Sequence, residues 1–363
     1  MIKVAAISDI HIGAQHANVL KEQLENYFLN VLENEKPDLV VICGDLIDHK
    51  LSFNSTDSKL AIDLIEELSK KYPVRLLKGT RTHDLDQLNN FIYLENKEGV
   101  NFKLYNKMIS EEIAGYKFLF MPEEYMEDYF EHYSDLLSDT YDIGFFHGTW
   151  NFAGYTNQLQ ESERPIKHAP LFKVKELTNV ARMFVGGHIH TSQQYENVLY
   201  TGSFSRWCMG EEEDKGFYIL EIDDNEINKT FYVNNLARKY VTLDVNQLIA
   251  NEEMTLDQKI NYIEEAKKNK DIYKLRIKFD SDGNDVDTTF IKDYFSKDSN
   301  VKVSVTNTTK EMENREEEKL TDEYSFIFKR EYDMPTMISM YLKKHDDVDL
   351  DPKVIEELLL QDE

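Results

Sequence analysis

Five short clusters of histidine, aspartate and glycine occur in the first half of the sequence, each directly after a short apolar run. Imidazole nitrogens and carboxylate oxygens are ligands that suit manganese, iron or zinc, and the clusters contain no cysteine, which disfavours a structural zinc site. One such cluster arises easily by chance, whereas five in order indicate a shared metal site. The clusters are Asp9-Ile10-His11, Gly44-Asp45, Gly79-Thr80-Arg81-Thr82-His83-Asp84, His147-Gly148 and Gly186-Gly187-His188-Ile189-His190.

The apolar runs that precede the clusters are typical of β-strands, and amphipathic segments between them are typical of helices. Ligand sites in α/β proteins gather at the carboxyl ends of the strands, so we expect the five clusters to converge. This pattern predicts an α/β layer architecture for residues 1–238. The predicted strands are Ile2–Ile7, Asp38–Ile42, Val74–Leu77, Lys117–Met121, Asp142–Phe146, Met183–Val185 and Phe217–Ile222, and the predicted helices are Ala17–Asn34, Asp57–Lys71 and Glu123–Asp135.

A small α+β domain is predicted over residues 239–306. An acidic linker with a short strand follows at 307–332, and two helices are predicted within 333–363. An apolar helix in such a position either docks on its own domain or binds a partner. The predicted elements of the small domain are the strands Tyr240–Val245, Ile272–Phe279 and Val301–Val305 and the helices Thr255–Lys268 and Asp287–Lys297.

The charge balance restricts the partners. Aspartate and glutamate number 68 against 42 lysines and arginines, which gives a formal charge of −26. Affinity for nucleic acid usually comes from basic side chains that displace counterions from phosphate, so a uniformly basic binding face is excluded. Bound divalent cations or a basic partner are two ways to hold a nucleic acid despite this charge. The alternative is a substrate that is not a polymer.

The chain has two cysteines, Cys43 and Cys208, without metal-type spacing. This argues against a disulfide scaffold and suits a reducing compartment. No apolar run reaches eighteen residues, and the opening segment does not have the pattern of a signal peptide. We therefore expect a cytoplasmic protein, or one of the host cytoplasm if it is viral, with no membrane association.

The order D-x-H, G-D, G…H-D, H-G and G-H-x-H resembles that of the calcineurin-like metallophosphoesterases over about residues 1–233. The resemblance implies a β-sandwich flanked by helices and two divalent metals, of which manganese is the expected one, that activate water and neutralise phosphate. It further implies one metal held by Asp9, His11, Asp45 and His190, a second held by the bridging Asp45 with His147 and His188, and His83 beside the leaving oxygen.

The third cluster departs from that family. The family has G-N-H-D or G-N-H-E, with the asparagine as a ligand of the second metal, whereas this chain has two extra residues and Thr82 directly before His83. A threonine hydroxyl is a weaker ligand than an amide oxygen. The second metal would then be held loosely, would use Asp84 or water, or would be missing. The last case leaves open a non-catalytic scaffold.

Within the superfamily the chain resembles the SbcD/Mre-type repair nucleases. The catalytic unit comes first, a small α+β unit stands where that family has its DNA-capping domain, and terminal helices follow. The resemblance implies DNA as substrate, docking on an SbcC/Rad-type ABC ATPase, and a homodimer. Some of these nucleases have a histidine three residues after the bridging aspartate, where this chain has Asp48 followed by His49. His49 and Arg81 are therefore candidate substrate contacts.

Two other functions stay open on the sequence alone. The same metal centre would serve a phosphatase or phosphodiesterase acting on a small molecule or phosphoprotein, for which the negative charge is less puzzling. The scaffold is the other. Aromatic residues after the fourth cluster suit base stacking but equally suit a loop packed on its own domain. Further cations could meet backbone phosphate, although in so acidic a chain most cations are solvated surface residues. The aromatic residues are Trp150, Phe152 and Tyr155, and the cations are Arg164, Lys167, Arg206 and Arg238.

Overall fold

A computed structural model describes residues 1–84, 86–126, 129–151, 171–251, 253–269, 271–280, 286–298, 300–306 and 353. The predicted linker and, apart from residue 353, the predicted terminal helices lie outside these residues, as do Phe152, Tyr155, Arg164 and Lys167. The chain divides into two compact units. The first is formed by Met1–Thr242 with Glu264–Leu275, and the second by Leu243–Ile263 with the described residues from Arg276 onward.

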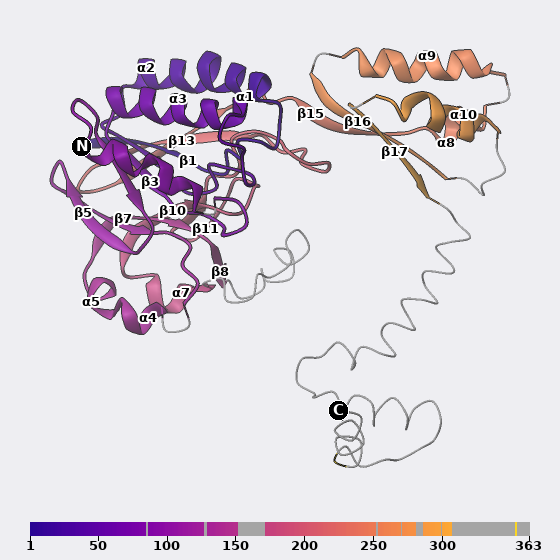
Figure 1. Ribbon diagram of the computed structural model, residues 1–363. Coiled ribbons are helices and arrows are strands. Elements are labelled where there is room, and N and C mark those ends of the chain that lie inside the picture. Colours follow the sequence, from indigo (N-terminus) through magenta and orange to yellow (C-terminus); the bar gives the residue numbers. More distant parts are fainter. Residues whose placement is uncertain are drawn as a thin grey trace. The chain divides into compact units, whose positions relative to one another are not determined.

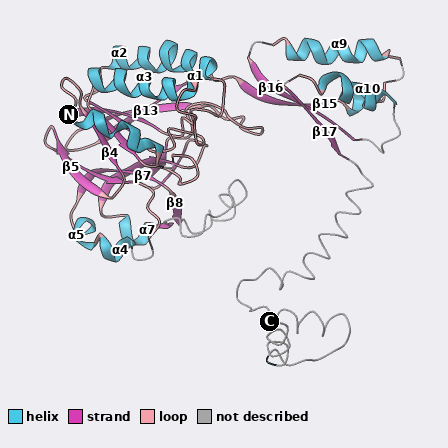
Figure 2. Ribbon diagram, in the orientation of Figure 1, coloured by secondary structure: helices cyan, strands magenta, loops and turns pink. Residues whose placement is uncertain are grey.

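The first unit is built on two six-stranded sheets (Figures 1 and 2). The first sheet has the order β14-β13-β1-β2-β3-β4, and the second has the order β11-β12-β10-β7-β6-β5. The strands are β1 (Ile2–Ile7), β2 (Leu39–Ile42), β3 (Val74–Leu77), β4 (Phe102–Tyr105), β5 (Ile109–Ile113), β6 (Tyr116–Met121), β7 (Tyr141–His147), β10 (Ala181–Gly187), β11 (Gln193–Tyr195), β12 (Val198–Tyr200), β13 (Gly216–Ile222) and β14 (Ile227–Val233). A separate pair joins β8 (Thr149–Asn151) to β9 (Leu171–Lys173).

The two sheets pack face to face. One buried cluster contains Val4 and Val41 from the first sheet with Phe120, Phe145 and Val185 from the second. Strand β1 is parallel to β2, and β7 is parallel to both β6 and β10. These strands are apolar on both faces, because helices cover the outer side of each sheet. The helices are α1 (Ala17–Gln23), α2 (Asn30–Glu35) and α3 (Thr56–Lys71) on one side (Figure 1), and α4 (Tyr129–His132), α5 (Ser134–Leu137) and α7 (Val174–Leu177) on the other.

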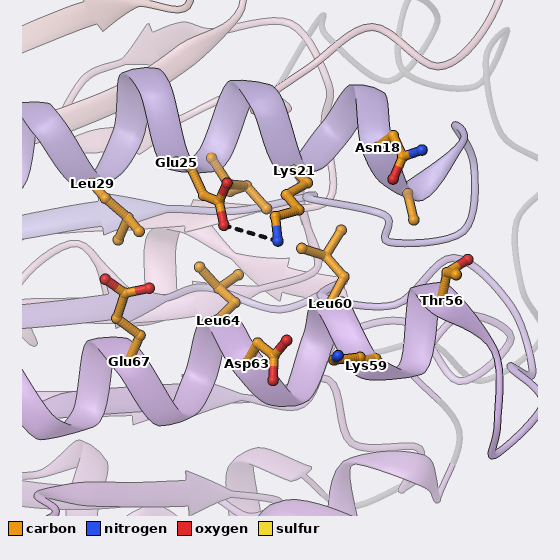
Figure 3. Close-up of a pocket in the computed structure, with 12 residues that line it drawn as sticks. Asn18, Lys21, Glu25, Leu29, Thr56, Lys59, Leu60, Asp63, Leu64 and Glu67 are labelled. Atoms are coloured by element: carbon orange, nitrogen blue, oxygen red, sulfur yellow. Dashed lines mark ion pairs between the residues drawn. The ribbon is translucent and has the colours of Figure 1, made fainter.

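Helix α3 shows how the sequence specifies these helices. The Ser55 hydroxyl accepts a hydrogen bond from the Ser58 amide at 3.1 Å, which satisfies a donor of the first turn. Leu60, Leu64 and Leu68 recur at helical spacing and are buried. A groove of about 150 Å³ between α1 and α3 is lined by Leu60, Leu64 and charged residues, among them the ion pair Lys21–Glu25 (Figure 3). None of the histidine–aspartate clusters reaches this groove.

The predicted α/β fold with a helix-flanked sandwich is confirmed. The predicted helix Ala17–Asn34 is observed as α1, a π-helical segment and α2, which together run to Glu35. The predicted helix Glu123–Asp135 is wrong at its start, because residues 122–126 are not helical and the described helix α4 covers Tyr129–His132. In this segment the Glu123 amide donates a hydrogen bond to the Lys78 carbonyl at 3.0 Å instead of to a helix carbonyl.

The elements after residue 238 form a small α+β arrangement, with a three-stranded sheet in the order β15-β16-β17. Its elements are β15 (Lys239–Asp244), α8 (Asn246–Ile249), α9 (Leu256–Lys267), β16 (Ile272–Asp280), α10 (Val286–Phe295) and β17 (Val301–Thr306). Alternate residues of β16, namely Leu275, Ile277 and Phe279, are buried, as expected for a strand with one covered face. In the described part of the chain, no helix has the length and apolarity to cross a bilayer.

Candidate metal centre

The ends of six strands bring the predicted residues together. Since β1, β2 and β3 run parallel in one sheet and β6, β7 and β10 in the other, their carboxyl ends meet at one edge of the sandwich. All seven histidines and aspartates predicted for the centre belong to groups whose ligand atoms lie within 4.8 Å of one another. The groups are Asp9–His11–His190, His11–Asp45–His83, Glu123–His147–His188 and Asp9–Asp45–His147.

Asp9, His11 and His190 form the first group. A carboxylate oxygen of Asp9 lies 3.7 Å from Nε2 of His190 and 4.0 Å from Nε2 of His11. The Asp9 carboxylate is held by the His188 amide at 3.1 Å and by the Ser8 hydroxyl. Asp9 and His11 are almost fully buried, so the surrounding protein, and not solvent, contacts their donor atoms.

Asp45 lies between the two groups. Its Oδ2 is 4.0 Å from Nε2 of His11 on one side and 3.3 Å from Nε2 of His147 on the other. Two divalent cations close together repel each other unless an anion lies between them. Asp45 therefore occupies the place that a bridging carboxylate requires, and His147 with His188 stands on its far side.

The donor set fits divalent cations. The Nδ1 of His147 lies 2.7 Å from the Cys43 carbonyl and donates its proton there, so Nε2, which faces Asp45, is the nitrogen that would bind a cation once its own proton is lost. Imidazole nitrogen and carboxylate oxygen are the donors of manganese, iron and zinc sites. Gathering so many carboxylates and histidines out of water without a cation would be costly.

Protonation within the centre is tightly coupled. Burial alone would raise the pKa of Asp45, but the neighbouring His147, His11 and His83 outweigh it and lower that pKa well below its usual range. Burial would lower the pKa of His147, yet Asp45 raises it well above the ordinary value. Burial, with the charge on His147, lowers the pKa of His188 to about 4. Neutral His188 is ready to bind a cation, whereas a cation must displace the proton of His147.

The backbone of the centre is strained. Asp9, His11 and Asp45 have φ near 50°, and His188 has φ of 101°. Residues other than glycine seldom adopt positive φ. Such outliers concentrate at functional sites, where the surroundings hold them. Gly79 makes the close approach possible, because a Cβ there would lie 2.3 Å from the Asp45 amide nitrogen and carboxylate.

His83 stands at the margin of the centre. Its ring lies 4.7 Å from that of His11, and its Nδ1 contacts the carbonyl of Asp48 at 2.5 Å. The proton on Nδ1 is donated to that carbonyl, so Nε2 is the atom able to exchange a proton with a substrate. The side chain is 20% exposed, which leaves it accessible from solvent, unlike Asp45 and His147.

Three candidate residues lie outside the centre. Thr82 and Arg81 are exposed, and His49 is exposed and bound to Asp48 at 2.8 Å. Thr82, which we expected in the asparagine position, is exposed, whereas the hydroxyl of buried Thr80 lies within the centre, 3.1 Å from Asp45, 3.2 Å from His147 and 3.3 Å from His188.

Of the other predicted cations, Arg206 is buried and donates to the carbonyls of Ala237 and Glu213, which makes it a structural residue. Arg238 pairs with Glu22 at 3.3 Å. Trp150 is fully buried in the core beside the second sheet, so its ring is not a stacking platform.

Three residues of the centre were not predicted from the sequence: Glu123, Trp207 and Glu211. The sequence pattern predicts a helix at Glu123, although this residue comes just after a predicted strand, as the five clusters do. The Trp207 ring stacks on His11 with centroids 4.8 Å apart, and its indole N–H donates to Nδ1 of His190 at 2.6 Å. A carboxylate oxygen of Glu211 lies 3.3 Å from the same atom. No sequence pattern predicts Trp207 or Glu211 in the centre, because both lie in the loop between β12 and β13 and not at the end of a strand.

Known proteins resemble this chain in sequence. It is 25% identical over 300 residues to the SbcD component of the nuclease SbcCD of Staphylococcus epidermidis, an alignment that covers 72% of this chain and 77% of that protein. Among solved structures, the nuclease MPE of Pseudomonas putida is 12% identical with a TM-score of 0.29 and covers 59% of this chain and 83% of its own. The cold-active protein-tyrosine phosphatase of a Shewanella species is 13% identical with a TM-score of 0.34 and covers 65% and 79%.

Both TM-scores are below 0.5, and no functional argument rests on them. The family evidence comes from the sequence: the calcineurin-like phosphoesterase model matches residues 2–192, more than half of the chain. These residues include all seven of the predicted histidines and aspartates of the centre. The chain therefore belongs to the calcineurin-like phosphoesterase family.

Proposed function

We propose that the chain is a metal-dependent nuclease that hydrolyses phosphodiester bonds of DNA with two divalent cations. The observation that carries this proposal is the placement of Asp45 between two groups of buried histidines and carboxylates. Asp9, His11 and His190 would hold one cation, and His147 and His188 the other. When bound, such cations lower the pKa of water and neutralise the charge that builds on phosphate.

The residues of this chain supply the remaining chemistry. His83 is placed to hand a proton from Nε2 to the leaving oxygen, since its other nitrogen is occupied by the Asp48 carbonyl. The backbone amide of Thr80 donates to Asp45 at 2.6 Å and fixes the carboxylate that both cations would share. The burial of Asp9, Asp45 and His147 keeps bulk water away from the charges.

DNA is proposed as substrate on two grounds. The Staphylococcus epidermidis relative, which is named as part of the nuclease SbcCD, aligns over 72% of the chain, well beyond what the metal centre needs. The described chain also continues past the sandwich into a small α+β arrangement that a minimal phosphatase does not require. The net charge of −26 implies that the cations, or a basic partner, hold the phosphate backbone.

The test compares substrates under one set of conditions. Purified full-length protein with manganese is expected to degrade linear or single-stranded DNA faster than it hydrolyses phosphopeptides or cyclic nucleotides. Asp45→Ala and His188→Ala should abolish the activity, and His132→Ala, an exposed histidine on α4, is the matched control. Hydrolysis of the small substrates with all DNA left intact would overturn the proposal.

Hydrolysis of phosphopeptides or cyclic nucleotides, with DNA left intact, would favour a phosphatase or phosphodiesterase. A specific observation supports this alternative: an open pocket of about 450 Å³ adjoins Glu123 and carries both acidic and basic side chains, including Lys78, Arg81 and Glu124. Such a mixed lining suits a small charged molecule better than a polyanion. Manganese and iron should be compared as the activating metal, because the donor atoms suit both.

We further propose, from the resemblance and from the relative's name, that the chain works with an SbcC-type ABC ATPase and as a homodimer. Tagged full-length chain should retain such an ATPase from its native extract, and deletion of residues 351–363 should release it. Retention after the deletion would place docking elsewhere, and sedimentation of the purified chain would report the oligomeric state.

A further inference from the structure

Glu123 is a carboxylate that enters the centre from an element with no recognised motif. It follows β6 directly, is 2% exposed, and has its amide bound to the Lys78 carbonyl at 3.0 Å. Its two oxygens have different surroundings. The Tyr125 hydroxyl donates to Oε1, whereas Oε2 lies 3.7 Å from Nδ1 of His188 and 3.9 Å from Nε2 of His147.

These separations are too long for hydrogen bonds. They are close to the spacing of atoms that share one ion, since ligands at about 2.1 Å from a metal lie roughly 3.0–3.5 Å from one another. Binding would draw Oε2 and the two nitrogens together by a few tenths of an ångström. Its ion-pair neighbours in the described chain are His147 and His188, the histidines on the far side of Asp45.

Thr80 has a different relation to the same atoms. Its single hydroxyl lies between 3.1 and 3.4 Å from Asp45, Glu123, His147 and His188. A hydroxyl has one proton to donate and remains a weak neutral ligand. Its amide and hydroxyl both contact Asp45, so Thr80 is suited to orient that carboxylate.

We propose that Glu123 is the carboxylate ligand of the second cation, together with Asp45, His147 and His188, and that Thr80 positions Asp45 without binding the cation itself. An anion then stands in the second site where the resemblance led us to expect a neutral amide. The added negative charge favours divalent cations and partly offsets their pull on a bound phosphate.

The inference rests on the proposed two-metal enzyme, but its readout is metal count and not hydrolysis. Full-length protein stripped with a chelator is titrated with manganese alone, and bound metal is measured by calorimetry and elemental analysis. Wild type is expected to bind two equivalents. Glu123→Gln keeps the size and the Tyr125 contact, and it is expected to bind one equivalent, with the second at least about ten-fold weaker.

Two variants make the assignment specific. Glu124→Gln changes the adjacent carboxylate, which binds Tyr133 and the Met108 amide, and should retain both equivalents. Thr80→Val keeps the shape and should also retain both. Two equivalents in Glu123→Gln, or loss of the second in Thr80→Val alone, would overturn the inference. Wild type that binds fewer than two would instead contradict the proposed two-metal function.

Discussion

The Nε2 atoms of His11 and His190 lie 3.3 Å apart, although the two residues are separated by almost the whole catalytic unit in sequence. The Asp9 carboxylate lies within 4.0 Å of both nitrogens. These two imidazole nitrogens and the carboxylate form a candidate cation site. Trp207 packs on His11 with its ring planes 26° apart and restrains that ring.

The first prediction follows from this pair. His190→Ala should remove one cation equivalent and lower phosphodiester hydrolysis by at least about 100-fold, which corresponds to about 2.7 kcal/mol of barrier. The measurement is the rate on a chromogenic phosphodiester with bound manganese counted in parallel. His132→Ala should change neither quantity, and a variant His190→Ala with both equivalents intact would remove this histidine from the metal site.

His83 should behave differently from the histidines that we propose as metal ligands. His83→Ala is expected to retain both cation equivalents and to lose about 100- to 10,000-fold in rate, the usual range for a general acid. The loss should shrink on substrates whose leaving group needs no proton, such as a nitrophenyl ester. An equal loss on good and poor leaving groups would assign His83 a role in binding instead.

Asp84 should stabilise the loops of the centre. Its carboxylate is fully buried and accepts hydrogen bonds from the amides of Asp45, Ile47 and Gly79 at 2.8–3.1 Å. Burial, with the nearby Asp45 charge, raises the pKa of Asp84 to about 7. At pH 8 Asp84→Asn replaces one acceptor oxygen with a donor, so it should reduce the free energy of unfolding by about 2–3 kcal/mol.

Chemical denaturation at pH 8 measures this difference. The matched control is Asp86→Asn, because Asp86 is 93% exposed and its nearest cation, Lys78, lies 3.7 Å away. That variant should change stability by less than about 0.5 kcal/mol. Equal stability of the two variants would show that the three amides do not depend on the carboxylate.

The convergence of the seven histidines and aspartates was predictable from sequence for a physical reason. Parallel strands carry their ends to one edge of a sheet, so a ligand after each strand needs no further information to find its neighbours. The segment PEEYMEDYF around Glu123 has helical periodicity and therefore predicts a helix. Periodicity contains no information about the hydrogen bond from the Glu123 amide to the carbonyl of Lys78, directly after β3.

Thr80 and Thr82 show a second limit. Counting back from His83 selects Thr82, and counting forward from Gly79 selects Thr80, because a loop can accept extra residues on either side of a ligand. The choice depends on backbone hydrogen bonds: the Thr80 amide is bound to Asp45, and the amides of His83 and Asp84 return to the Thr80 carbonyl. Arg206 shows the same limit, since the sequence does not reveal that its guanidinium is buried against the carbonyls of Ala237 and Glu213.

The last prediction concerns stability and acid pH, through Arg75 and Glu111. The Arg75 guanidinium is buried and binds both oxygens of Glu111, at 2.7 and 2.9 Å, across the β3 and β5 strands. Burial would raise the pKa of Glu111, but the bonds from Arg75, Lys103 and Tyr105 lower it to about 2 from an ordinary 4.5. The stabilisation is therefore complete above pH 4.5 and is lost as the pH falls towards 2.

Arg75→Met should lower the free energy of unfolding by about 3 kcal/mol at neutral pH, because it leaves a half-buried carboxylate without its bidentate partner. Glu111→Gln should flatten the decline of stability between pH 4.5 and 2, since no proton is then taken up at this position. Glu112→Gln, on the exposed side of the same strand, should leave that decline intact. The measurement is urea denaturation at a series of pH values, and an unchanged slope in Glu111→Gln would assign the acid sensitivity to other carboxylates.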